Sequence, residues 1–213
     1  MKLPLEGLKI LDLSHALAGP FCSTMLADYG AQVIKIEPPG KGDIARAWGT
    51  KLPGGETDYF VGLHRNKQGI VLDLKNAEGK ETFLRMVERC DVVLENFRPG
   101  TLVKLGVDYE VARKRNPGII YCSISGFGQD GPYRDRPALD LIVQAESGMI
   151  SATGDEGGHG ARAGCVDRRS DGGHECRARH HDGPTCQRRN RGGAVDRHLD
   201  ARRPTLVAEH DDR

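Results

Sequence analysis

Short apolar segments alternate with amphipathic ones along the chain, and this alternation limits the possible folds more than any other feature of the sequence. The apolar segment 8–13 is followed by a turn at 18–20, by apolar residues at helical spacing up to Gly30, and by a second apolar segment at 32–36. Strand, helix and strand within about thirty residues predict a βαβ unit with parallel strands and a right-handed crossover.

The same alternation continues to residue 149. Further strands are expected at 69–72, 91–94 and 118–124, and further helices at 77–89, 109–115 and 140–149. This order predicts an α/β fold, with a Rossmann-like open parallel sheet and helices on both faces. We therefore expect residues 1–155 to form one domain of this kind.

Ligands of open parallel sheets bind beyond the carboxyl ends of the strands. The loops expected there are 14–20, 37–43, 73–76, 95–100 and 125–130. Residues in such loops serve equally well as turn and cap residues, so position alone does not assign a function. The first loop has one glycine, Gly19, where a dinucleotide fingerprint needs three. A nicotinamide-dependent dehydrogenase is therefore disfavoured.

Charge and hydropathy exclude several classes of partner. Thirty-one Lys and Arg residues balance 30 Asp and Glu residues, so the chain has no strong overall field to attract nucleic acid. No apolar run approaches the roughly 20 residues of a membrane span, and the N-terminus lacks the apolar stretch of a secretory signal. The six cysteines follow no regular spacing. We expect reduced thiols, a cytoplasmic location, and neither nucleic acid nor membrane as partner.

Ordered motifs over about residues 4–155 resemble the family III CoA-transferases, the CaiB/BaiF group. They include Leu5-Glu6-Gly7-Leu8, Ala18-Gly19-Pro20, Leu26-Ala27-Asp28-Tyr29-Gly30-Ala31, Arg65-Asn66-Lys67, Leu72-Asp73-Leu74-Lys75, Glu95-Asn96-Phe97-Arg98-Pro99-Gly100 and Gly131-Pro132-Tyr133. The resemblance implies an acyl-CoA and a carboxylic acid as substrates, with no prosthetic group. It also implies a homodimer of interlocked subunits, which we do not expect this chain to form fully.

The resemblance places a CoA site on four stretches of this sequence. The adenine pocket would fall at the first stretch and the pantetheine and phosphate path at the third. The candidates are Leu17 and Ala18; Leu72, Asp73, Leu74 and Lys75; Asn96, Phe97, Arg98 and the nearby Lys104; and Pro137, Ala138, Leu139 and Asp140. Because CoA carries several phosphate charges, the basic members suit it, although Lys75 and Lys104 are equally well explained as solvated surface charges.

Two reaction classes share this resemblance. The racemases use a histidine directly before an aspartate, but here Leu139 precedes Asp140, and leucine is neither acid nor base. The transferases use an aspartate that attacks the thioester, in an Ala-Asp-x-x-Ala-Gly context roughly thirty residues further on. The sequence therefore predicts a CoA-transferase, with an acyl-CoA racemase or a non-catalytic CoA- or nucleotide-binding fragment as alternatives.

The composition changes sharply near residue 156, after which there is no Phe, Tyr, Trp, Ile or Lys. Such a segment has too little apolar surface to offset chain entropy, which predicts disorder. His174, Cys176, His180, His181 and Cys186 are of the types that bind zinc, but no CxxC pair sets a geometry and we predict no metal site. A basic nucleic-acid arm is disfavoured because acidic residues dilute the arginines.

A shifted reading frame explains this segment best. One set of codons for residues 168–183, read from the second base, encodes Ala-Asp-Leu-Thr-Ala-Gly followed by further apolar residues. We therefore expect 156–213 to be an out-of-frame, disordered tail and the CoA-binding domain 1–155 to be incomplete. Asp167 and Asp171 lie near the place of the transferase aspartate but in the wrong context, so we expect this chain to be inactive.

Overall fold

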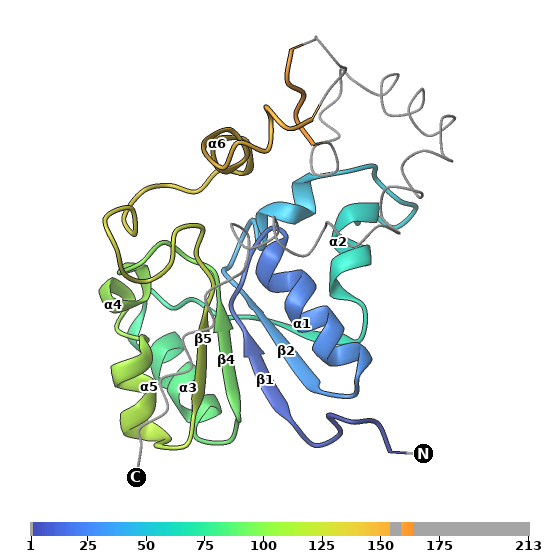
Figure 1. Ribbon diagram of the computed structural model, residues 1–213. Helices are drawn as coiled ribbons and strands as arrows, with labels where there is room; N and C mark the ends of the chain where they lie inside the picture. Colours follow the sequence, from blue (N-terminus) through green and yellow to red (C-terminus); the bar gives the residue numbers. More distant parts are fainter. Residues whose placement is uncertain (1, 154–158, 164–213) are drawn as a thin grey trace. The chain divides into compact units, whose positions relative to one another are not determined.

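The computed structural model describes residues 2–153 and 159–163 (Figure 1). They fall into two units, 2–136 and the described part of 137–163, and each is described by itself. The strands are β1 (Lys9–Asp12), β2 (Gln32–Glu37), β3 (Lys67–Val71), β4 (Val92–Glu95) and β5 (Ile120–Ser123). The helices are α1 (Ala18–Asp28), the 3-10 turn η1 (Ile44–Ala47), α2 (Asp58–His64), α3 (Ala77–Val87), α4 (Thr101–Leu105), α5 (Tyr109–Arg115) and, in the second unit, α6 (Asp140–Glu146).

The five strands form one sheet in the order β3-β2-β1-β4-β5, and every strand pairing within it is parallel. The expected α/β fold with an open parallel sheet is therefore confirmed. The sequence analysis did not predict α2 and α4, which have seven and five residues. Thr57 caps the N-terminus of α2, because its hydroxyl oxygen accepts the Phe60 amide at 3.3 Å.

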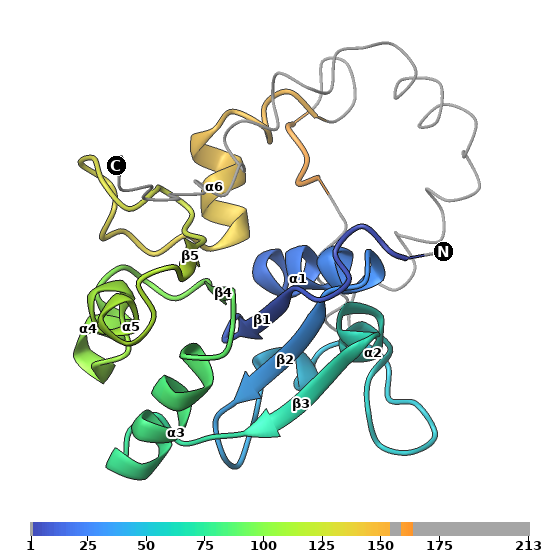
Figure 2. The same ribbon diagram turned by 90° about the horizontal axis from the view of Figure 1, so that it is seen from below.

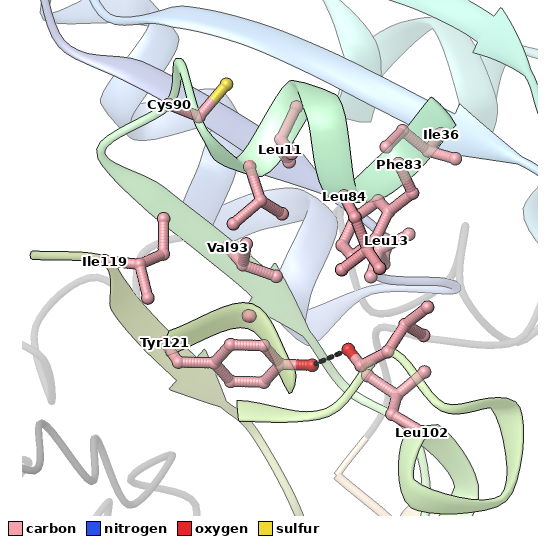
Figure 3. Packing of buried hydrophobic residues seen from close by; sticks show 13 residues of the cluster. Leu11, Leu13, Ile36, Phe83, Leu84, Cys90, Val93, Leu102, Ile119 and Tyr121 are labelled. Carbon is pink, nitrogen blue, oxygen red and sulfur yellow. Dashed lines mark hydrogen bonds between the residues drawn. The ribbon is translucent and has the colours of Figure 1, made fainter. Parts of the chain in front are cut away.

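One face of the sheet is covered by α3, α4 and α5, opposite α1 and α2 (Figures 1 and 2). Leu11, Ile36 and Val93 point from alternate strand positions into this layer and pack against Phe83 of α3 (Figure 3). The Tyr121 hydroxyl donates to the Val107 carbonyl oxygen at 3.0 Å, so this buried ring leaves no polar atom unpaired.

The opposite face changes character along the strands. Toward the amino ends it is apolar, with Ile10, Val33 and Val92 packed against α1. Two residues further along the same strands, Asp12 and Lys35 point to the same side and are also buried. The polar part of this layer therefore lies under the carboxyl ends of the strands.

The second unit contains α6 and a short segment bound to it. The Gln144 side chain, 1% exposed, accepts the Ala163 amide at 3.0 Å, and Ala161 donates to the Thr153 carbonyl oxygen at 3.0 Å. Residues 159–163, which the sequence places in the tail, are thus hydrogen-bonded to 144–153. The rest of the predicted tail lies outside the described residues.

Truncating the centre of the apolar layer should reduce stability strongly. Phe83 is 0% exposed, and Phe83→Ala is expected to lower the free energy of unfolding by about 3–5 kcal/mol through lost burial and a cavity. Val103 on α4 is 64% exposed, so the control Val103→Ala should change it by less than about 0.5 kcal/mol. Urea unfolding measures both, and equal effects would contradict this assignment of the core.

Candidate functional site

The carboxyl ends of β1 and β4 mark the place where the winding of the sheet reverses. From β1 the chain adds β2 and β3 on one side, and then returns to add β4 and β5 on the other. The loops that leave the neighbouring strands β1 and β4 therefore run in opposite directions along the edge of the sheet. This topological switch point is where open α/β sheets bind their ligands.

Asn96 joins these two loops. Its side-chain oxygen accepts the His15 amide at 2.7 Å, and its side-chain nitrogen donates to the His15 carbonyl oxygen at 2.7 Å. The start of α1 also passes close by, since a Cβ added to Gly19 would lie 3.5 Å from Asn96 Cγ and 2.2 Å from Ser14 Cβ. Glycine is therefore required at position 19 by close packing.

The structure brings two of the four predicted stretches together at this point. Leu17 precedes α1 without capping it through a side chain, and Ala18 begins the helix on an exposed surface. Phe97 follows Asn96, with its ring edge-on to His15 at a centroid distance of 5.2 Å. Arg98 comes next and is exposed.

The stretch Leu72–Lys75 follows the edge strand β3. Its Leu72 and Leu74 pack against the apolar layer, while the Asp73 side chain accepts the Lys75 amide at 3.0 Å and an Asn76 side-chain N–H at 3.2 Å. These contacts are those of a turn that leads into α3. The stretch shares the carboxyl edge of the sheet with the switch point, and within the described residues no hydrogen bond or ion pair joins the two.

The remaining predicted residues belong to α4, to the second unit or to the part of the chain outside the described residues. Lys104 is exposed on α4. Pro137, Ala138, Leu139 and Asp140 belong to the second unit, where Leu139 is 67% exposed and Asp140 accepts a Gln144 side-chain N–H at 2.6 Å. Asp167, Asp171, His174, Cys176, His180, His181 and Cys186 are outside the described residues.

A buried ion network beneath the switch point was not predicted. Asp12 and Lys35 are direct neighbours across the β1–β2 pairing. Lys35 Nζ lies 3.0 Å from Asp43 Oδ2 and also donates to the Ser14 carbonyl oxygen. The Lys35 and Asp43 side chains are 2% and 0% exposed, so the ion pair is shielded from water.

Lys67 completes the network from β3. Its Nζ lies 3.2 Å from Asp12 Oδ2 and donates to the Pro20 carbonyl oxygen at 2.8 Å and to the Ser23 hydroxyl at 2.7 Å. Burial alone would raise the pKa of Asp12, but the charges of Lys35 and Lys67 hold it below its usual value. Asp12 is therefore a buried carboxylate that ties α1 to the sheet.

Asp43 has the same character. Burial opposes its ionisation, yet the nearby His15 ring, the charge of Lys35 and the amides of Ala16 and Ala45 keep its pKa far below the usual range. Its neighbour Glu37 binds Arg46 at 2.7 Å, which lowers the pKa of Glu37 against the effect of burial.

The sequence carries one signal for this network. A lysine at a buried position of an interior strand requires an anionic partner, and one aspartate ends β1 while another lies in the loop after β2. Among the described residues, no group of three or more His, Cys, Asp or Glu side chains is arranged to hold a metal ion. None of the described helices is long and apolar enough to cross a membrane.

Comparison with known proteins decides the family. The sequence profile described as CoA-transferase family III matches residues 5–167. The chain belongs to this family. An acetyl-CoA:oxalate CoA-transferase from Acetobacter aceti is 50% identical to this family III chain over 163 residues, which cover 76% of this chain and 42% of that protein.

Two further relatives agree. A succinyl-CoA:glutarate CoA-transferase from Homo sapiens is 45% identical over 161 residues, covering 76% of this chain and 37% of that protein. The crystal structure of a CAIB/BAIF family protein from Brucella suis matches with a TM-score of 0.73 and 40% identity, over 78% of this chain and 45% of that chain. This family III chain thus spans less than half the length of these relatives.

His64 makes the stability of this network sensitive to acid. Its side chain is 6% exposed, with Nε2 3.8 Å from Asp43 Oδ2 and Nδ1 3.4 Å from Lys67 Nζ. Burial, followed by the charges of Lys67 and Lys35, lowers its pKa to about 4. In the unfolded chain the pKa is about 6.5, so acid protonates the unfolded state first.

The free energy of unfolding should therefore fall as the pH drops from about 6.5 toward 4. In His64→Gln the slope between pH 6.5 and 5 should be shallower, because the group that titrates differently in the two states is gone. His159 is exposed, and His159→Gln should retain the slope of the parent chain. Urea unfolding at several pH values measures this, and identical slopes in all three proteins would be the contrary result.

Proposed function

We propose that residues 1–155 are the CoA-binding domain of a family III CoA-transferase, a class that moves CoA from an acyl-CoA thioester to a carboxylic acid. The observation that carries this proposal is that Asn96 and Phe97 lie against His15 and Gly19, which flank Leu17 and Ala18 in the loop before α1. CoA is a substrate in this scheme, and no prosthetic group is needed.

The chemistry of the switch point suits CoA. The first turn of α1 contains no acidic residue, so its N-terminal amides present positive potential to phosphate groups. Arg98, Lys75 and Lys104 are exposed, and in the described part of the chain no ion pair joins them to a carboxylate. Leu17 and Ala18 offer apolar contact to the adenine, and Asn96, Phe97 and Arg98 line the path of the pantetheine and phosphates.

The acceptor is a carboxylic acid. The two curated relatives described above are named for oxalate and glutarate, which are both dicarboxylates. In the complete reaction an aspartate oxygen attacks the thioester carbon and the CoA thiolate leaves, so the acyl group becomes a mixed anhydride on the enzyme. The CoA thiolate next attacks the aspartyl carbonyl carbon and expels the donor acid, which leaves CoA as a thioester on the aspartate. The acceptor carboxylate displaces the CoA thiolate from this thioester and forms a second anhydride. The thiolate then attacks the acceptor carbonyl carbon of that anhydride, which yields the acceptor CoA thioester and regenerates the aspartate.

We propose that this chain binds CoA without transferring it. The Ala-Asp-x-x-Ala-Gly context of the nucleophile does not occur in its sequence. An out-of-frame segment 156–213 accounts for this difference, and the coding DNA around codons 150–170 tests it directly. Leu139 before Asp140 disfavours the racemase alternative. A cytoplasmic location and a homodimer of the complete protein belong to the same proposal.

Binding can be measured by titration calorimetry with CoA. We expect a Kd in the millimolar range or below, and Arg98→Ala should weaken binding about tenfold through loss of a charge-assisted contact to phosphate. Arg89 is also exposed but precedes β4 at the opposite edge of the sheet, so Arg89→Ala is the matched control. Absence of heat at millimolar CoA would refute the binding proposal.

Transfer can be measured by thioester exchange. We expect no turnover when the purified chain is given an acyl-CoA donor and a dicarboxylate acceptor, although CoA still binds. Mass spectrometry after incubation with the donor should detect no acyl adduct on the chain. Turnover that disappears in Asp167→Asn or Asp171→Asn would show that one of these residues is a working nucleophile.

A further inference from the structure

The segment between β1 and α1 is held by side chains rather than by regular secondary structure. The Ser14 amide donates to Asp12 Oδ1 at 2.9 Å, and the His15 peptide is bound at both its N–H and its C=O by Asn96. The Ala16 amide donates to Asp43 Oδ1 at 3.0 Å. Consecutive backbone groups of this segment are therefore fixed by residues from β1, the β2 loop and the β4 loop.

Ala16 is the residue at which this fixing matters most. Its φ of 67° lies in the left-handed region, which a residue with a Cβ adopts only when its surroundings compel it. The Asp43 carboxylate accepts the hydrogen bond from the Ala16 amide. The same carboxylate oxygen accepts the Ala45 amide at 2.9 Å and so begins η1.

Lys35 links the two ends of the segment. Its ammonium group pairs with Asp43 Oδ2 at 3.0 Å and donates to the Ser14 carbonyl oxygen. The two partners of this buried ion pair thus hold the backbone on both sides of His15: Lys35 binds Ser14, and Asp43 binds Ala16. Because both partners are almost completely buried, neither can change its position without leaving a charge unpaired.

The ring of His15 lies between these anchors. Its side chain is 22% exposed, its Nδ1 is 3.7 Å from Asp43 Oδ1, and its ring meets the edge of Phe97. Asp43 therefore faces both the backbone that follows His15 and one nitrogen of its ring. The exposed part of the ring lies in the loop that leaves β1 at the switch point.

We propose that Asp43, supported by Lys35, is a positioning residue that holds Ala16 in its left-handed conformation and presents His15 to the bound CoA. This inference rests on the proposed CoA-binding function. Asp43 itself does not contact the ligand in this proposal. It acts on CoA binding indirectly, by holding the Ala16 amide and by facing the His15 ring. His15 is the polar side chain that the segment offers to CoA.

The test uses Asp43→Asn in the full chain, with hydrogen exchange and calorimetry as readouts. The amide variant keeps an acceptor oxygen but loses the charge that holds Lys35. We expect amide exchange at Ala16 to accelerate at least tenfold, exchange at Val93 in β4 to stay unchanged, and CoA to bind about tenfold more weakly. A purely structural role would accelerate exchange at both positions.

The control is Asp91→Asn. Asp91 also accepts a backbone amide from another segment, that of Lys9 at 2.8 Å, but at the opposite edge of the sheet. This variant should leave Ala16 exchange and CoA affinity unchanged. If it weakens CoA binding as much as Asp43→Asn does, the effect is not specific to the segment and the inference fails.

A second variant covers the case in which Asp43→Asn does not fold. Ala16→Pro removes the amide that Asp43 binds and forbids a positive φ, without touching a buried charge. CoA binding should again weaken about tenfold with the core amides still protected. Parental affinity in either folded variant would overturn the inference. If the parent chain itself does not bind CoA, the proposed function fails, and Ala16 exchange in Asp43→Asn still decides whether Asp43 holds the segment.

Discussion

The buried pairing of Asp12 and Asp43 with Lys35 and Lys67 is the constraint on which the carboxyl edge of the sheet depends. Two negative and two positive side chains balance one another in a space that excludes water. Removing one partner of such a set leaves an uncompensated buried charge, which costs about 3–5 kcal/mol. The four side chains therefore depend on one another, and the elements that carry them are held in fixed positions relative to each other.

The two faces of the sheet consequently serve different purposes. The layer under α3 and α5 is mostly apolar and contributes mainly stability, as the complete burial of Phe83 shows. The layer under α1 gives up part of that apolar burial to hold charges. In return, the orientation of α1 and of the loop before it is fixed, because hydrogen bonds and ion pairs require particular angles. Apolar contacts impose no such requirement and allow the packed elements to shift.

The fold was predictable because every strand and most helices leave a periodic pattern, and a sheet of alternating strands and helices has few possible topologies. The geometry of the site was not. Lys35 lies in an apolar strand, where a lysine is ordinarily read as exposed, and its burial depends on aspartates from two other segments. The left-handed Ala16 has no signal in the sequence, since alanine is among the residues least suited to that conformation.

The resemblance to relatives identified Asn96 and Phe97 as candidates, but it could not show why the loop before α1 has its shape. The hydrogen bonds and the ion pair that hold this shape join groups within residues 12–96. On the function proposed above, recognition of CoA and the chemistry of transfer are therefore physically separable. A rigid sheet that fixes its own ligand-facing loop can retain affinity for the thioester even where no nucleophile is present to attack it.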